Sequence, residues 1–324
     1  MRVLLTGAFG NIGVSALEAL LERQHRVRCF DIQTKTTEET AKRFGDAIEV
    51  VWGDLRDSEA VAEAVEDQNV VIHLGFIIPK LSASGIESES APDLAWDVNV
   101  RGTLNVLNAL RAQPNPPRLV FASSYHVYGL TQDQPPPRTV DDPVCPVEHY
   151  ARHKVACEWL VKASRLDWTI LRFSATLPIS LRLDPYMFEI PLANRMEFVH
   201  TRDVGVALAN AVTNEEVWGK TLLIGGGPEC QLTYREIVEG VMQTMGIGML
   251  PEDAFGSEPF ATDWVDSSES ESLLQYQKRT FQDYLRDMRD LLGAKHILLR
   301  LFGPLVRLWL LRKSTFWHAK RSGT

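Results

Sequence analysis

Cysteines are few in this sequence, and none of them stand at the spacing of a metal or redox motif. Cys29, Cys145, Cys157 and Cys230 are far apart and form no Cys-x-x-Cys pair. Zinc sites and dithiol redox motifs place two cysteines within a few residues of each other. We therefore expect four buried, unpaired thiols in a reducing compartment and no bound metal.

A signal sequence and long hydrophobic runs are also absent. No stretch of about 18 uncharged apolar residues, the length that indicates a spanning helix, occurs in the chain. The first apolar run, Val3 to Leu5, is followed at once by a glycine-rich segment without a cleavage-site pattern. These absences predict a cytoplasmic protein.

Positive charge is scarce in the chain as a whole but concentrated at its C-terminal end. The formal net charge is −8, which argues against nucleic acid as a partner. No acidic residue follows Asp290, whereas residues 295–324 hold seven Lys/Arg and two His. The first 294 residues hold 27 basic side chains against 42 acidic ones, a formal charge of −15. The sequence therefore joins a basic tail to an acidic body.

Strand and helix patterns alternate through the first 125 residues and continue beyond them. Short apolar runs such as Val3–Thr6 and Val70–Leu74 alternate with segments of helical spacing such as Ile12–Arg23. This alternation predicts an α/β protein with a Rossmann-type, doubly wound parallel sheet. Further strands are expected at 26–31, 48–52, 118–122, 168–172 and 221–224, and further helices at 38–44, 58–65, 93–110, 149–164, 201–213 and 233–244.

The chain divides into three expected parts. Residues 1–172 should form the nucleotide-binding domain, with its sheet completed by parts of 198–225. Residues 173–197 and 226–293 should build a small C-terminal substrate lobe over the strand ends. Residues 294–324 should form a basic amphipathic tail.

A glycine-rich turn lies where the first strand becomes the first helix. Gly7, Gly10 and Gly13 form the pattern Gly-x-x-Gly-x-x-Gly. The first glycine permits a tight turn, the second lets the backbone approach a pyrophosphate, and the third lets the helix pack closely. The helix N-terminus adds free N–H groups for phosphate oxygens. The neighbouring residues of the turn, Phe9, Asn11 and Ile12, are expected to contact the same dinucleotide.

Two aspartates after the next strands indicate which dinucleotide binds. Asp31 ends the second strand, where its carboxylate can accept hydrogen bonds from the adenosine ribose and would repel a 2′-phosphate. NAD is therefore expected rather than NADP. Asp54 can bind the adenine amino group while Leu55 packs on the ring, and Asp57 or Ser58 in the same turn can cap the next helix.

A candidate catalytic set follows the fifth strand. Tyr150 and Lys154 are four residues apart on a predicted helix, so they share one face. A nearby ammonium group favours phenolate and is expected to lower the Tyr150 pKa toward the working pH. Ser124 can hold the oxygen of an alcohol or ketone while Tyr150 exchanges its proton and a nicotinamide exchanges hydride.

Taken together, these residues resemble the extended short-chain dehydrogenases/reductases of the NAD-dependent epimerase/dehydratase family. The resemblance implies that Ser124, Tyr150 and Lys154 are catalytic and that Asn99 supports them, with Asn99, Tyr150 and Lys154 also contacting NAD. It places Leu74 and Gly75 beside the cofactor. It runs from residue 1 to about 285, through the glycine turn, Asp31, Asp54, His73-Leu74-Gly75, Asn99 to Leu107, Ser124, Tyr150/Lys154, Leu171-Arg172, Phe198 to Val204 and Trp264 to Tyr284.

The resemblance also implies a homodimer. Similar proteins pack together through the two helices that correspond here to 93–110 and 149–164. The candidate contact residues on them are Trp96, Val100, Leu104, Val155 and Trp159, for each of which a place in the core is the alternative.

The residues after Ser124 narrow the reaction. Dehydratases of the family need an acidic pair directly after the catalytic hydroxyl, whereas Tyr125 and His126 occupy those positions. Dehydration is therefore not expected. Both residues are candidates for substrate contact, and His126 can also act as an extra acid or base because its pKa is ordinarily near neutral.

The substrate itself stays open at the level of sequence. Arg182 and Arg195 can bind a diphosphate or form exposed ion pairs. The first hypothesis is an epimerase or oxidoreductase of a sugar or nucleotide sugar. The second is a dehydrogenase or ketoreductase of a sterol- or lipid-like alcohol at a membrane surface, and the third is an NAD-sensing regulator without chemistry, against which the intact catalytic set argues.

The tail permits three interpretations. Residues 296–312 are mostly apolar with arginines on one helical face, and Gly303-Pro304 should bend the helix. Such a helix can lie on an anionic membrane surface. It can instead dock on its own body or on a dimer partner, or form a frayed end.

Overall fold

Seven parallel strands form the central sheet of a computed structural model that describes residues 1–79, 85–180 and 185–322. Their order is β3-β2-β1-β4-β5-β6-β8. From β1 the strands follow one another toward one edge of the sheet, and from β4 toward the other edge. The carboxyl ends of β1 and β4 therefore form the switch point at which ligands bind in such folds. The predicted doubly wound sheet is confirmed. The strands are β1 Arg2–Thr6, β2 Arg26–Asp31, β3 Glu49–Trp52, β4 Val70–His73, β5 Arg118–Ser124, β6 Trp168–Phe173 and β8 Thr221–Ile224.

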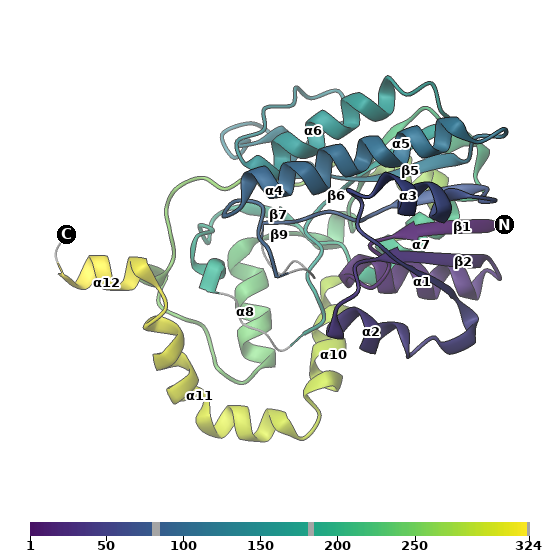
Figure 1. Cartoon of the computed structure of the whole chain (residues 1–324). Coiled ribbons are helices and arrows are strands. Elements are labelled where there is room, and N and C mark those ends of the chain that lie inside the picture. Colours follow the sequence, from purple (N-terminus) through teal and green to yellow (C-terminus); the bar gives the residue numbers. More distant parts are fainter. Residues whose placement is uncertain (80–84, 181–184, 323–324) are drawn as a thin grey trace.

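Helices cover both faces of this sheet (Figure 1). One layer holds α1 Asn11–Glu22, α2 Lys35–Ala41, α7 Thr201–Ala211 and α9 Ser268–Leu274; the other holds α3 Ser58–Val65, α4 Pro92–Trp96, α5 Gly102–Ala112 and α6 His149–Lys162. Short 3₁₀ turns lie at Gly45–Ala47, Tyr125–Tyr128, Pro185–Phe188, Glu215–Val217, Pro228–Cys230 and Glu252–Ala254.

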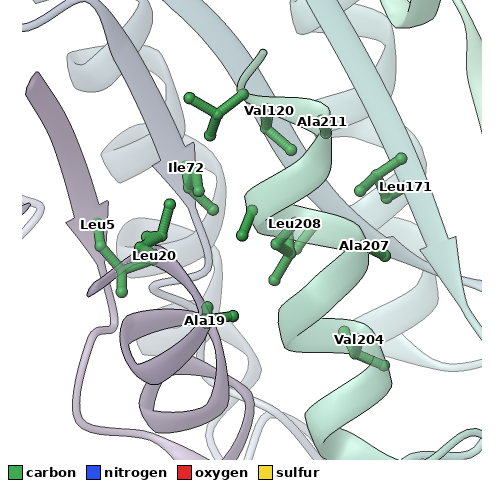
Figure 2. Packing of buried hydrophobic residues seen from close by; sticks show 14 of the residues in the cluster. Leu5, Ala19, Leu20, Ile72, Val120, Leu171, Val204, Ala207, Leu208 and Ala211 are labelled. Atoms are coloured by element: carbon green, nitrogen blue, oxygen red, sulfur yellow. The ribbon is translucent and has the colours of Figure 1, made fainter. Parts of the chain in front are cut away.

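The closest helix packing joins α1 to α7. A Cβ atom on Gly205 would overlap the carbonyl oxygen of Ser15, so the two helix backbones touch at this point. Figure 2 shows Leu208 of α7 among apolar side chains of α1 and of the strands, including Leu20 and Ile72. This contact fixes the helix that begins with the phosphate-binding turn against the rest of the domain.

Three local expectations were wrong. The helix expected at 93–110 is divided by a π-helical turn over Asp97–Arg101. The helix expected at 38–44 begins earlier, because Thr34 forms a capping box with Thr37. Cys145 is exposed, since it lies in the loop before α6, whereas the other three cysteines are free and buried as expected.

The lobe is built on a small antiparallel pair, β7 Arg195–Glu197 with β9 Gln231–Thr233, that sequence patterns did not indicate. Helices α8 Tyr234–Thr244 and α10 Phe281–Leu292 pack beside it. The chain continues into α11 Lys295–Leu311 and α12 Thr315–Ser322, whose buried side chains join the same apolar core. None of the described helices is both long and apolar enough to span a membrane.

Candidate active site

The glycine turn between β1 and α1 has the geometry of a phosphate cradle. Gly7 has a φ of +65°, and a Cβ atom there would lie 2.8 Å from the backbone nitrogen of Gly75. A Cβ atom on Gly13 would overlap the carbonyl oxygen of Gly7. Helix α1 begins after Gly10 with no side-chain cap and no acidic residue in its first turn. Its first N–H groups therefore suit the pyrophosphate of a dinucleotide.

Asp31, at the end of β2, is hydrogen-bonded to the glycine turn. It is 9% exposed, and its carboxylate accepts hydrogen bonds from the backbone nitrogens of Phe9, at 2.9 Å, and Ile32, at 2.8 Å. Burial raises the pKa of Asp31, although these two bonds oppose the rise. Each carboxylate oxygen keeps a lone pair for a ribose hydroxyl, so the cradle fits NAD.

The turn after β3 contains an ion pair that sequence reasoning missed. The Arg56 guanidinium bonds both oxygens of Asp54, with Nη2 2.6 Å from Oδ2, and this bond holds the pKa of Asp54 below its ordinary value. The adenine contact expected of Asp54 therefore stays a prediction. Leu55 is buried against Gly102, and Asp57 caps α3 by accepting from the nitrogens of residues 59 and 60, which confirms that alternative.

A series of hydrogen bonds holds the segment after β4 against β1. Thr6 Oγ1 accepts from the backbone nitrogens of Leu74 and Gly75 and lies 2.7 Å from His73 Nδ1. The other ring nitrogen of His73 lies 3.0 Å from Thr103 Oγ1, and burial lowers the His73 pKa to about 3. A neutral imidazole therefore links β1, β4 and α5, and places Leu74 and Gly75 beside the cradle.

Asn99 has a positioning role in this structure. It is fully buried in the π-helical turn, where its amide brackets the backbone of Ile77, accepting from the nitrogen at 2.6 Å and donating to the oxygen at 2.9 Å. Its Nδ2 also lies 3.2 Å from His153 Nδ1 on α6. Asn99 thus ties the segment after β4 to the helix that carries Tyr150 and Lys154.

Ser124, Tyr150 and Lys154 come together as predicted. Ser124 ends β5, and its side chain lies beside the phenol of Tyr150 in the first turn of α6. Glu89 accepts from the backbone nitrogens of His149 and Tyr150, which fixes the start of that helix. Lys154, one turn later, has its Nζ 5.7 Å from the centre of the Tyr150 ring.

The electrostatics of this set differ from the expectation that Lys154 lowers the Tyr150 pKa. Burial and the negative charge of Glu148 raise the Tyr150 pKa, and the neighbouring Ser124 side chain only partly opposes this. Lys154 is 3% exposed, and burial lowers its pKa to about 7. Its Nζ donates to the Ala122 oxygen at 2.7 Å. The prediction was wrong because both groups are desolvated, so their neutral forms are favoured.

His126 has a carboxylate partner that the sequence did not reveal. Its Nδ1 lies 2.8 Å from Glu148 Oε2, and both side chains are 18% exposed. The imidazole stands edge-on to the Tyr150 ring, with ring centres 5.9 Å apart. Phe260 from the lobe meets His126 at the same distance, and Tyr186 packs on Phe260. His126 therefore lies between the catalytic phenol and an aromatic wall of the lobe.

Two other candidate substrate residues, Tyr125 and Arg195, make contacts within the protein. Tyr125 is 4% exposed and stands edge-on to the His126 ring, and burial raises its pKa. The Arg195 guanidinium bonds both oxygens of Asp263 and the carbonyl oxygens of residues 131 and 134, so the ion-pair alternative holds for it. Arg182 lies outside the described residues.

A buried network supports the strand that carries Ser124. The carboxylate of Glu158 accepts from Ser123 Oγ at 2.6 Å and from two nitrogens of Arg172, whose third contact is the hydroxyl of Tyr128. The guanidinium on β6 and the carboxylate on α6 satisfy each other away from water. The resemblance had included Arg172, but no local pattern indicated Glu158 as its partner.

Comparison with known proteins agrees with this geometry. The family model described as the NAD dependent epimerase/dehydratase family matches residues 3–177. L-arabinose 1-dehydrogenase (NAD(P)(+)) of Haloferax volcanii is 33% identical over 174 residues, 49% of this chain and 59% of that protein. Sterol demethylase protein B of Methylococcus capsulatus is 29% identical over 208 residues, 62% of this chain and 58% of that protein. The chain spans about a third to three fifths of the length of the curated relatives it matches.

A solved structure extends the similarity over almost the whole chain at the level of fold. The UDP-glucuronic acid 4-epimerase of Bacillus cereus, in complex with UDP-glucuronic acid and NAD, has a TM-score of 0.74. It is 21% identical and covers 90% of this chain and 98% of its own. At that identity the likeness concerns the fold alone.

Proposed function

Since the chain belongs to the NAD-dependent epimerase/dehydratase family and is an enzyme of the short-chain dehydrogenase/reductase type, we propose that it moves hydride between NAD and a secondary alcohol or ketone. The observation that carries this proposal is the grouping of three side chains: Ser124 lies beside the Tyr150 phenol, and Lys154, one helical turn further on, has its Nζ 5.7 Å from the centre of the Tyr150 ring.

Each residue of the set has a separate task. NAD, when bound, supplies or takes up the hydride. In reduction, Ser124 Oγ donates a hydrogen bond to the substrate oxygen, and Tyr150 Oη delivers the proton to it, because its raised pKa keeps the phenol protonated at neutral pH. In oxidation the same transfer runs in reverse, and Tyr150 Oη, as phenolate, takes the proton of the alcohol. With its pKa at about 7, Lys154 is partly ammonium at neutral pH, and this form stabilises the negative charge on Tyr150 Oη.

The lobe side of the site favours a largely apolar substrate. Phe260 faces His126, Tyr186 packs on Phe260, and Arg195 is committed to Asp263. A guanidinium group suits a diphosphate, but Arg195, the described candidate, is already paired, whereas a hydrophobic ring system packs well on aromatic side chains. A relative named sterol demethylase protein B supports the same choice. We therefore place a sterol- or lipid-like alcohol first.

A sugar substrate is the second candidate. It is favoured by the 33% identical relative named L-arabinose 1-dehydrogenase. With a sugar, the same three residues would support either net oxidation or epimerisation, in which the ketone is reduced again on its other face.

A substrate panel separates these candidates. The protein is incubated with NAD and hydroxysteroids, free sugars or nucleotide sugars, and NADH absorbance is followed. We expect NADH to accumulate with a hydroxysteroid. Accumulation only with a free sugar would select the second candidate, and epimer formation with tightly retained NAD and no net NADH would show an epimerase.

Replacing the phenol tests the chemistry itself. Tyr150→Phe should lower turnover about 10²- to 10⁴-fold, the usual contribution of a general acid or base. NAD binding, measured by fluorescence titration, should stay near the wild-type value because the cradle is unchanged. A variant that keeps its turnover would contradict the role of Tyr150, and loss of all NAD binding would point to misfolding.

A further inference from the structure

Helix α11 has two unlike faces. On the inner face, Gly303 runs against the turn at Gly246, where an added Cβ atom would lie 2.9 Å from the Gly246 oxygen. Arg307 Nη1 bonds the Met249 oxygen, and Leu310 is fully buried in the lobe core. This face packs on the body of the same chain. The interpretation that the tail docks on its own body therefore holds for one side of α11.

The outer face of α11 is apolar and uncovered by the described chain. Its side chains are between 49% and 71% exposed, and their spacing places all of them on one side of the helix. A contiguous exposed apolar surface of this kind usually marks an interaction site. The α11 stripe, as we name it, consists of Leu301, Phe302, Leu305, Leu308 and Trp309.

Positive charge borders the α11 stripe. Arg312 and Lys313 are exposed at its end, with Lys313 Nζ 5.8 Å from the Trp309 ring centre. Residues 295–324 hold seven Lys/Arg and two His, and no acidic residue follows Asp290. Leu, Phe and Trp on one side of a helix with Lys and Arg nearby is the composition of helices that lie in a bilayer interface.

We infer that α11 binds the surface of a bilayer containing anionic lipids, with the α11 stripe inserted at the headgroup boundary. The positive tail complements anionic headgroups, whereas two copies meeting through their stripes would bring two basic tails together. The inner face stays on the lobe, so the helix lies in the plane of the surface and carries the body with it.

The same contact brings the lobe side of the active site to the lipid surface. Ser314 Oγ, directly after α11, donates to the Ala254 oxygen at 2.6 Å, and Phe316 of α12 packs over Gly256. The segment that follows carries Phe260, which faces His126. The site would then take an alcohol that resides in the bilayer; this last step rests on the proposed function.

Vesicle flotation tests the binding without any need for turnover. The full chain should float with vesicles of phosphatidylcholine and phosphatidylserine, and float poorly with phosphatidylcholine alone or at high salt. The double variant Leu305→Glu/Trp309→Glu should reduce the bound fraction at least about tenfold, because it removes two apolar contacts. Leu291→Glu, an equally exposed apolar position on α10, serves as the control.

The outcomes separate the two proposals. Equal flotation of the double variant and the wild type, or none for the wild type, would overturn the membrane inference while leaving the hydride chemistry intact. If the wild type formed dimers that dissociated in the double variant, the α11 stripe would be assigned to contact with a second copy, and the membrane inference would again be overturned. Flotation with no turnover of any alcohol would instead count against the proposed function alone. Thermal unfolding checks that each variant folds.

Discussion

Lys154 is the residue whose burial has the clearest consequence for stability. Its pKa is about 7 in the folded protein and 10.5 in its ordinary state. Between these values the unfolded chain binds one more proton than the folded one, so the buried amine lowers stability most at and below pH 7 and least near pH 10. Burying this amine therefore opposes folding at neutral pH.

Lys154→Met should abolish turnover but stabilise the nucleotide-free protein at pH 6 to 7. The free energy of unfolding of the variant should exceed that of the wild type, and this difference should shrink by about 1.4 kcal/mol for each pH unit between 7 and 10. Urea unfolding at several pH values measures it. Lys162→Met, on the exposed side of the same helix, is the control and should show no such trend. A gain that does not change with pH would contradict the lowered pKa.

Asp31 is predicted to set the choice of dinucleotide. Asp31→Ser should weaken NAD binding about 10- to 100-fold, the value of a lost charge-assisted hydrogen bond, and improve NADP binding relative to NAD. Titration with each nucleotide measures both constants. Glu39→Gln, an exposed carboxylate on α2, is the control. An unchanged ratio of the two affinities would remove Asp31 from cofactor selection.

At the scale of elements, local patterns predicted the Rossmann half well and the lobe poorly. Strands buried on both faces read as apolar runs, and the glycine turn marks the first strand-to-helix junction, so β1, α1 and β2 were predictable. The pair β7–β9 has three residues in each strand and forms only across the lobe, so no periodicity indicates it. The capping box at Thr34 has Thr37 in place of the usual Glu or Gln, so the common sequence signature did not indicate it.

The α1–α7 contact predicts a strong response to a single methyl group. Gly205→Ala adds a Cβ atom against the Ser15 oxygen, which is backbone and cannot rotate away. We expect a loss of about 1–3 kcal/mol in the free energy of unfolding, the usual cost of overpacking. Chemical unfolding measures it. As a control, Arg202→Ala on the same helix removes only a surface ion pair and should cost less than about 1 kcal/mol. If the two variants lost the same free energy of unfolding, the close contact between α1 and α7 would be contradicted.

At the scale of the whole molecule, contacts between distant segments decide the site. His126 and Glu148 are 22 residues apart, and Phe260 reaches them from the lobe. Such pairings depend on topology, so the sequence could name His126 but not its partners. Val100, a candidate dimer contact, is 7% exposed and packs in the apolar core, so the core alternative holds for it.

We expect the protein to form a homodimer through α4, α5 and α6. Trp159 is 70% exposed on α6, and Trp96 and Leu104 are also exposed on the neighbouring helices. Trp159→Glu should weaken the dimer at least about 30-fold, the usual effect of losing a central aromatic contact. Light scattering after size exclusion measures the mass. The Leu291→Glu control should leave it unchanged, and a wild-type monomer would contradict the expectation.

The π-helical turn at Asp97–Arg101 has a consequence for sequence alignment and protein engineering. A turn with i to i+5 bonds accommodates one residue more than an α-helical turn. An alignment of this segment with a regular helix therefore requires a one-residue gap, placed next to Asn99. Deleting one residue of the turn would give a continuous α-helix, but it would rotate α4 by about 100° relative to α5 and carry Trp96 away from His153, which it now meets edge-on.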